Sequence, residues 1–491
     1  MVAYLMKLLT SPPRLPRMSA AALALALLPT VSLAAPSAAP AADMGATLGL
    51  WTVIPFLGIL LSIAVLPLVA HHWWEHNRNR ALVAALFAVP VAAYLLFAHG
   101  AAGGHVLGEK LHEYVSFVVL LGSLFVITGG IYIRGSLSGT PLVNTAILAI
   151  GAGLASFIGT TGASMLLIRP LLRANKSREK TTHIVIFFIF AVSNCGGLLT
   201  PLGDPPLYLG FLKGVPFDWT LQLWKEWALV NVILLVVFNI WDQRVLNQEE
   251  KRRAGPQLER VMEHEPFRID GMLNFVWLLA IVGVIYASGE GIGTGGKPWP
   301  MGAPEAAMLA VCAAAWFTTQ STNRANNKFT WGPIAEVAIL FAGIFVTMAP
   351  ALLILNSWGQ GTRQVFGQGF TASEPWQYFW MSGMLSSFLD NAPTYLTFTA
   401  TAAGKLGVPA EGSFLAPFIE KGPGAEMLLA AISCGSVFMG ANTYIGNGPN
   451  FMVKAIAEEN KVRMPSFFGY MAWSFGILIP IFLVVTWVFF R

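Results

Sequence analysis

Charged residues are scarce in this chain. Only 11% of its residues are Asp, Glu, Lys or Arg, against roughly 25% in an ordinary soluble protein. Apolar residues make up 55% of the sequence. So few charges cannot cover the surface of a soluble protein of this length, and the composition therefore excludes an ordinary soluble globular fold.

Cysteine is also scarce, with Cys195, Cys312 and Cys434 as the three examples. All three lie in apolar stretches without paired or metal-type spacing, so the sequence offers neither a disulfide framework nor a zinc site. We interpret them as small apolar side chains. The sequence also lacks a Ser/His/Asp grouping, a Gly-rich phosphate loop and an H-E-x-x-H helix, and we predict no enzyme activity and no bound cofactor.

Long apolar runs, in contrast, recur along the chain. A run of about 18 or more apolar residues can cross roughly 30 Å of hydrocarbon. We predict full spans at 47–70, 81–98, 114–133, 182–211, 223–241, 272–288, 303–319, 334–355, 425–453 and 467–490. The predicted fold class is an all-α polytopic membrane protein with about 10–11 transmembrane helices.

Two further apolar stretches, 141–172 and 376–403, are too long for one straight span. Each is interrupted near its middle by small and polar residues, and the sequence at its two ends is expected on the same side of the membrane. We therefore predict two re-entrant hairpins.

The first 43 residues differ from the rest. Lys7, Arg14 and Arg17 precede the apolar run "SAAALALALLPTVSLAA", which ends in a small-residue pattern typical of a secretory signal. A Pro/Ala-rich stretch follows as far as Asp43. We predict a signal-like leader and linker over 1–43. Whether it is cleaved or retained as a first span, Met44 starts on the outer side of the membrane.

The positions of the basic residues give the orientation. The net charge is +5, and most of the 30 Lys and Arg fall in loops on one face of the predicted topology, including the cluster 169–180 and the run 244–268. Basic residues gather in cytoplasmic loops, so this face is predicted to be cytoplasmic. The bias explains the net charge without a nucleic-acid partner. We predict a multi-pass protein of a bacterial inner membrane, in contact with membrane lipid, with its C-terminus on the periplasmic side.

The two hairpins carry related sequences. "SFIGTTGASML" at 156–166 and "SFLDNAPTYLT" at 387–397 lie at the hairpin centres, and "TPLGDPP" at 200–206 and "TYIGNGP" at 443–449 lie in the spans that follow. In the predicted topology the first hairpin enters from the cytoplasm and the second from outside, which makes an inverted repeat. The predicted divisions are a first half at 44–241, a cytoplasmic connector at 242–270 and a second half at 271–491.

The spans 182–211 and 425–453 are predicted to be broken helices. In the first, glycines and prolines in "SNCGGLLTPLGDPP" stop the helix, and Asn194, Thr200 and Asp204 supply oxygen atoms around the gap. A helix broken inside a membrane exposes carbonyls that suit a cation and N–H groups that suit an anion. Inverted repeats with broken helices and polar residues at mid-membrane are typical of secondary transporters.

These residues resemble a known group of proteins. The "SFLDNAPT" tip and the "SNCGGLLTPLGDPP" break are similar to the ion transporter superfamily, in particular its NhaD-type sodium/proton antiporters and the citrate-transporter-like (CitMHS) family, and more distantly to INDY-type divalent anion/sodium symporters. The resemblance covers essentially everything after residue 44. It implies a homodimer in which a transport domain, made of both hairpins and both broken helices, slides like an elevator against a fixed scaffold.

Individual residues match the antiporter pattern. Asp390 and Asn391 match the Asp-Asn of the second hairpin, and Ser386 matches one helical turn earlier. Asn194 and Asp204 match the Asn and Asp of the first broken helix. The resemblance thus implies that both broken regions contribute to one ion site.

The first hairpin departs from that pattern. Where the antiporters carry another Asp-Asn, this chain has Gly159 and Thr160, followed by Thr161. One carboxylate of the set implied by the resemblance is therefore missing.

The two remaining carboxylates separate the possible substrates. An isolated carboxylate at membrane depth costs several kcal/mol, so it binds a cation, takes up a proton or pairs with a base. Asp204 and Asp390 have no Lys or Arg in their own motifs and could exchange H⁺ for Na⁺. A citrate trianion there would need bound cations to mask both charges. We predict a sodium/proton antiporter working by alternating access; the alternative is a cation-coupled transporter of citrate or another di- or tricarboxylate.

Sodium prefers about five or six hard oxygen ligands. We predict that Asp204, Asp390 and Asn391 are its main ligands. The wider ion-binding set also includes Asn194, Thr200, Gly159, Thr160, Thr161, Ser386, Thr394, Asn442, Thr443 and Asn447. For Thr394 and Asn447, a role in capping a hairpin or helix end is an equal alternative.

Two other ionisable residues have alternative interpretations. Glu336 is either a helix-start carboxylate or a participant in proton movement. Arg169 either reaches the inner membrane surface or meets a carboxylate.

Overall fold

The computed structural model describes residues 42–134, 138–252, 268–297 and 299–491, so almost all of the predicted leader lies outside the described residues. The described residues belong to one unit, 40–491. Within those ranges the chain is helical except for a two-stranded antiparallel pair, β1 (Tyr132–Arg134) and β2 (Arg268–Asp270). Seven described helical segments are long and apolar enough to cross a membrane. The predicted all-α polytopic fold is confirmed.

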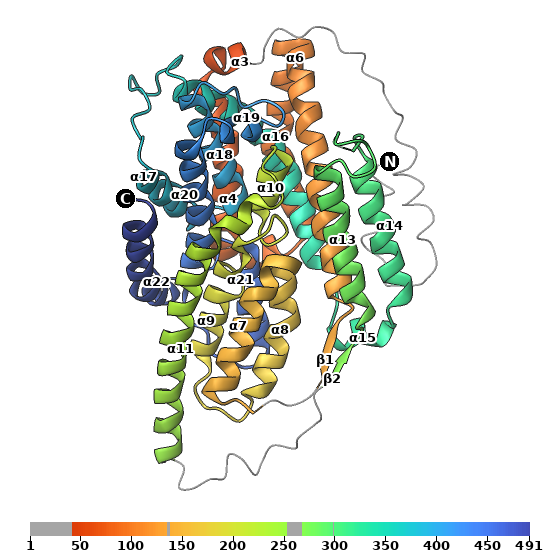
Figure 1. The fold of residues 1–491 in the computed structure, drawn as a ribbon, viewed down its shortest axis with the longest axis vertical. Helices are drawn as coiled ribbons and strands as arrows, with labels where there is room; N and C mark the ends of the chain where they lie inside the picture. The colour runs from red at the N-terminus through yellow and green to blue at the C-terminus, as the bar shows by residue number, and fades with distance from the viewer. Residues whose placement is uncertain (1–41, 135–137, 253–267, 298) are drawn as a thin grey trace. The chain divides into compact units, whose positions relative to one another are not determined.

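The helices of the predicted first half and those of the second follow in chain order (Figure 1). The first half contains α3 (Ala42–Thr47), η1 (Leu50–Val53), α4 (Ile54–Val69), α5 (His71–Trp74), α6 (Asn77–Thr128), α7 (Pro141–Ile158), α8 (Thr160–Ala174), α9 (Thr182–Ala191), η2 (Cys195–Leu198), α10 (Pro205–Leu212), η3 (Trp219–Leu223) and α11 (Trp224–Arg252). The second contains α13 (Leu273–Gly289), α14 (Ala303–Thr318), α15 (Ser321–Asn326), α16 (Gly332–Gly359), α17 (Pro375–Ser386), α18 (Asn391–Lys405), α19 (Leu415–Ile419), α20 (Pro423–Met439), η4 (Gly440–Asn442), α21 (Gly448–Glu459) and α22 (Phe467–Phe489).

Helix α6 contains two of the predicted spans. The chain reverses at Gly100, whose φ of 52° and ψ of −122° are not helical. Directly after this reversal, Gly103 packs on the carbonyl of Leu95, where a Cβ would overlap that oxygen. The span predicted to begin at residue 114 therefore starts soon after Gly100, because the glycines allow a tighter reversal than the apolar pattern indicates.

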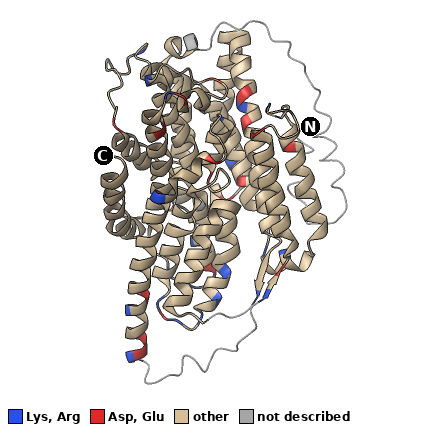
Figure 2. Ribbon diagram, in the orientation of Figure 1, with Lys and Arg blue, Asp and Glu red and all other residues tan. Residues whose placement is uncertain are grey.

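Helix α11 is longer than the predicted span 223–241. It continues to Arg252, into the sequence assigned to the cytoplasmic connector. This extension is rich in Glu, Gln, Lys and Arg, which are good helix formers and need no lipid. Figure 2 shows Lys and Arg side chains at this end of α11 and on the β1–β2 pair, as expected for a cytoplasmic face.

A buried polar network fixes the base of the first hairpin. The guanidinium of Arg178 donates to Asp242 and Glu249, both at 2.8 Å. His183 and Asn144 also hydrogen-bond to the Asp242 carboxylate, at 2.8 and 2.9 Å. The network joins α7, the segment after α8, α9 and α11, and it holds these elements in one group.

The two hairpins are the central feature of the fold. Helices α7 and α8 meet at Gly159, and α17 and α18 meet at the segment ending in Asp390. In Figure 1, α7 and α8 enter from the lower end of the view and α18 enters from the upper end. The C-terminal pieces of the broken helices pack across the repeats, α10 against α18 and α21 against α8. This arrangement is the inverted repeat that the sequence predicts.

A second buried charge cluster connects α6 to the end of α10. Glu113 accepts hydrogen bonds from Lys110 at 2.9 and 3.0 Å and pairs with Lys213 at 2.6 Å. The three residues are only 6%, 6% and 3% exposed in the order Lys110, Glu113, Lys213. Two buried ammonium groups thus share one carboxylate.

Candidate functional site

Both broken helices resume at equivalent residues. Asp204 is the N-cap of α10 in an extended conformation, and Pro205 and Pro206 follow in the first turn. Asn447 is the N-cap of α21 in the same conformation, with Pro449 in the first turn. Proline fits the first turn of a helix because its missing N–H would have no intrahelical partner there. The two N-caps therefore present their side chains at matching points of the repeat.

Close glycine crossings shape both breaks. The backbone at Gly197 crosses that at Gly203, and the backbone at Gly440 crosses that at Gly446. A Cβ on Gly203 would overlap the carbonyl oxygen of Gly197, and one on Gly446 would meet the carbonyl oxygen of Gly440. Each break is therefore a compact loop that only glycine can form.

Each break is also tied to the hairpin of its own half. The Thr200 hydroxyl donates to the Ser156 carbonyl, and the Ser156 hydroxyl donates to the Gly196 carbonyl at 2.6 Å. In the second half, the Thr443 hydroxyl donates to the Ser387 carbonyl at 2.5 Å. Thr200 and Thr443 thus hold the loops against the hairpin tips.

We expect Gly203→Ala to lower the free energy of unfolding by about 1–3 kcal/mol, because the new methyl group has to displace backbone. Thermal unfolding of the purified protein, followed by tryptophan fluorescence, measures this. Gly153→Ala is the matched control, since a Cβ at this position in α7 meets no atom within 4 Å. It should leave the protein as stable as the wild type or up to about 1 kcal/mol more stable. Equal stability of the two variants would contradict the packing argument.

The Asp204 carboxylate is the point at which the four segments meet. One oxygen, Oδ1, accepts hydrogen bonds from Thr160 Oγ1 at 2.8 Å and from Asn447 Nδ2 at 3.2 Å. The other, Oδ2, accepts a hydrogen bond from Asn391 Nδ2. Both hairpin tips and both breaks therefore contribute a side chain to one carboxylate, which is 1% exposed.

Two asparagines extend this cluster. Asn194 donates to the Asn450 side chain at 2.7 Å, and its Oδ1 accepts from Asn447 at 3.2 Å. Asn450 in turn donates to the carbonyls of Gly440 and Thr443, at 2.8 and 2.9 Å. Sequence reasoning did not select Asn450. Its position three residues after Asn447, on the same helix face, was the available signal.

Asp390 is beside this cluster but plays a different part in the structure. Its Oδ1 accepts the backbone N–H of Ala392 at 3.0 Å, so the side chain is the N-cap of α18. The Thr394 hydroxyl donates to the Asp390 carbonyl at 2.9 Å, which is the capping alternative for that threonine. The neighbouring Asn391 reaches Asp204, while no hydrogen bond joins Asp390 to Asp204 among the described residues.

The remaining predicted residues lie around the same junction. Gly159 has a φ of 80° and forms the turn between α7 and α8, and half-buried Thr161 follows in the first turn of α8. Ser386 donates to the Ser436 carbonyl at 2.6 Å. Asn442 donates to the Ser387 hydroxyl at 2.9 Å. These contacts are to backbone or to neighbouring hydroxyls, and none of them reaches Asp204.

The electrostatics of the junction favour a cation. Within the described ranges, no Lys or Arg forms an ion pair with Asp204, and Oδ1 of Asn391 and of Asn442 are buried without a hydrogen-bond partner. Unpaired amide and carboxylate oxygens are the ligands that a hard cation prefers. The residues present therefore fit a Na⁺ ion.

The other ionisable residues lie elsewhere. Glu336 pairs with Arg80 at 3.0 Å, which joins α16 to α6. Arg169 keeps one buried guanidinium nitrogen, Nη1, without a hydrogen-bond partner.

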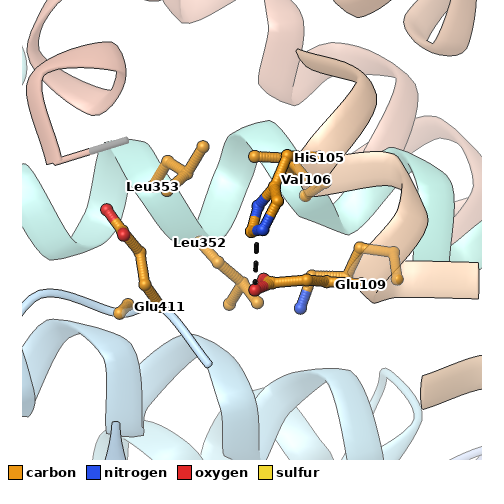
Figure 3. A pocket seen from close by; sticks show the side chains of 9 residues that line it. His105, Val106, Glu109, Leu352, Leu353 and Glu411 are labelled. Carbon is orange, nitrogen blue, oxygen red and sulfur yellow. Dashed lines mark ion pairs between the residues drawn. The ribbon is translucent and has the colours of Figure 1, made fainter. Parts of the chain in front are cut away.

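A small hollow of about 20 Å³ near α6 and α16 is also separate from the Asp204 cluster. His105, Glu109, Lys110 and Glu411 line it, and His105 and Glu109 face each other at 3.8 Å (Figure 3). The hollow contains none of the predicted ion-binding residues. It has room for about one water molecule.

Two hairpins, two broken helices and a buried carboxylate between inverted repeats together define the class of this protein, a multi-pass membrane protein built as a secondary transporter. A family model described as "Putative citrate transport" matches residues 45–490. The chain belongs to this citrate-transporter-like family, as its motifs indicate. No curated protein matches the chain.

Proposed function

We propose that this protein exchanges Na⁺ for H⁺ across the membrane, with Asp204 as the group that binds either ion. The observation that carries the proposal is the position of Asp204, a carboxylate that lies between both hairpin tips with three uncharged hydrogen-bond donors around it. A buried carboxylate without a basic partner is stable only when a proton or a cation neutralises it.

Competition at one carboxylate is sufficient for coupling. Asp204 with a proton has no charge to attract Na⁺, and Asp204 with Na⁺ bound does not accept a proton. Asp390, next to Asn391, adds a second negative charge at the hairpin tip and forms part of the proposed site. Its capping bond to Ala392 keeps its carboxylate close to the end of α18.

The proposed exchange needs the site to open alternately to the two sides. Asp204 and Asn391 are 1% and 0% exposed, so ions cannot reach them without a movement of helices. We infer that the two hairpins and the broken helices move together, because cross-repeat contacts such as Asn194 to Asn450 bind them into one group. An elevator movement of this group against α6, α13 and α14 would separate Lys213 from Glu113.

The family match favours a second candidate, cation-coupled transport of citrate or another di- or tricarboxylate. Amide and hydroxyl donors such as Asn391, Asn447 and Thr160 can bind a substrate carboxylate. In this case Asp204 would hold the coupling cation, and the anion would bind on top of it.

The deciding experiment uses the full chain in sealed vesicles that contain a pH-sensitive dye. A step of external Na⁺ alone should make the interior alkaline, because Na⁺ entry drives H⁺ exit. Labelled citrate is added to a second sample under the same Na⁺ gradient. A pH change with Na⁺ alone and no citrate uptake supports antiport. Citrate accumulation without the Na⁺-driven pH change selects the second candidate and overturns the first.

The external pH provides a further prediction for antiport. Because H⁺ and Na⁺ compete for Asp204, the Na⁺ concentration that gives half-maximal exchange should fall as the external pH is raised. The maximal rate should change much less, since saturating Na⁺ displaces the proton. Initial rates at several Na⁺ concentrations and pH values measure both quantities. A half-maximal concentration that does not depend on pH would contradict competition at one carboxylate.

A further inference from the structure

A second buried carboxylate lies apart from Asp204. Glu305 is in the first turn of α14 and is 8% exposed. Its Oε1 accepts a hydrogen bond from the Ser116 hydroxyl of α6, while its Oε2 is buried without any hydrogen-bond partner. In the part of the chain that the structure describes, no Lys, Arg or His forms an ion pair with it. Half of this carboxylate is therefore uncompensated.

Glu305 lines a cavity of about 100 Å³. The cavity lies between α6, α10, α13 and α14, and its polar lining includes His112, Tyr208 and Ser288. The share of liquid volume of one water molecule is about 30 Å³, so the cavity holds a small ion with one or two waters. The polar volume is in contact with the one carboxylate oxygen that lacks a partner.

We propose that this cavity is a second binding site for a monovalent cation, with Glu305 Oε2 as its charged ligand. One carboxylate balances a single positive charge, whereas the sites that hold Ca²⁺ gather several oxygen ligands with more than one carboxylate. The Ser288 hydroxyl and cavity waters supply further hard oxygens. Soft ligands are absent from the polar lining of the described residues, which favours Na⁺ or a similar alkali cation.

The cavity also contacts the element that begins at Asp204. Tyr208, Phe211 and Leu212 of α10 form one of its walls, and the Tyr208 hydroxyl lies 3.4 Å from the carbonyl of Ser116, next to the group that holds Glu305. A cation at Glu305 therefore lies on the other side of α10 from the α6, α13 and α14 helices that complete the cavity. Its binding is independent of whether Asp204 exchanges Na⁺ for H⁺.

The site is tested with the full-length, detergent-purified Asp204→Asn protein, so that binding at Asp204 does not contribute. Equilibrium binding of radioactive Na⁺ should be saturable in this variant. Adding Glu305→Gln should remove the saturable binding. Ser116→Ala, which takes away the hydrogen bond that orients the carboxylate, should weaken it by roughly 10–100-fold. An excess of unlabelled Li⁺ or K⁺ tests the selectivity among monovalent cations.

Glu290→Gln is the matched control, because this carboxylate at the end of α13 is exposed and lies outside the cavity lining. It should leave the Na⁺ affinity unchanged. Unfolding temperatures of all variants identify any loss of fold, and Glu305→Asp provides a second variant that keeps the charge and should retain weakened binding. Absence of saturable binding in folded Asp204→Asn, or full binding after Glu305→Gln, would overturn the proposal. Loss of exchange in the vesicle assay alone concerns Asp204 and leaves this result unaffected.

Discussion

Replacing Asp204 by Asn is expected to reduce Na⁺-driven proton movement to the level of protein-free vesicles. The amide has the size of the carboxylate but holds neither a dissociable proton nor a charge for Na⁺. The fold should tolerate the change, because Asn391 can turn its unpartnered Oδ1 toward the new amide. We therefore expect a stability loss of less than about 1.5 kcal/mol, the value of one hydrogen bond. The internal pH dye and the unfolding temperature measure the two effects separately.

Asp390→Asn is the natural companion to this variant. Asparagine is as good an N-cap as aspartate, so the bond to Ala392 and the start of α18 should be preserved. Loss of exchange would then show that the second charge participates in ion binding, as we propose. Full exchange by Asp390→Asn would restrict the coupling to Asp204. Full exchange by Asp204→Asn would refute the proposed mechanism.

Glu113→Gln is expected to cause the largest loss of stability. The carboxylate is the shared partner of Lys110 and Lys213, and its removal leaves two ammonium groups buried without a counter-charge. Breaking a buried ion pair in this way costs roughly 3–5 kcal/mol. The unfolding temperature should fall markedly, and the effect should remain at high salt because the cluster is shielded from water.

Two control variants separate burial from charge. Lys110→Met should cost much less, since it leaves Glu113 paired with Lys213 at 2.6 Å and a neutral cluster. Glu458→Gln breaks an exposed pair with Lys454 and should change the stability by less than about 1 kcal/mol. If Glu113→Gln were as mild as Glu458→Gln, the cluster would not contribute to stability in the way that its burial indicates.

The local pattern of the sequence was sufficient to predict the hairpins and breaks. Glycine and proline at fixed positions, such as Gly203 and Pro205, stop a helix wherever they occur in an apolar run. Repetition of these stops in the second half made the inverted repeat visible before any coordinates. The long helix α11 was predicted too short, because hydropathy marks the end of the lipid and says nothing of where a helix stops in water.

Buried charges were the main feature that the sequence did not reveal. Lys110 and Lys213 were counted among loop residues of the outer face, and Arg178 among those of the inner face. In the structure each is buried against a carboxylate from a distant part of the chain, such as Glu113 or Asp242. A tally of charges along a sequence contains no information on which of them pair.

The sequence by itself determined that this is a multi-pass membrane protein with two hairpins, two broken helices and opposed repeats, because run length, proline and glycine act locally. Only the tertiary structure decided that Asp204 is the shared acceptor for Thr160, Asn391 and Asn447, and that Asp390 caps its own helix. The same residue types were available at both tips. Which of them turns toward the junction depends on the approach of segments that lie far apart in the chain, and that approach is set by the packing of the whole membrane domain.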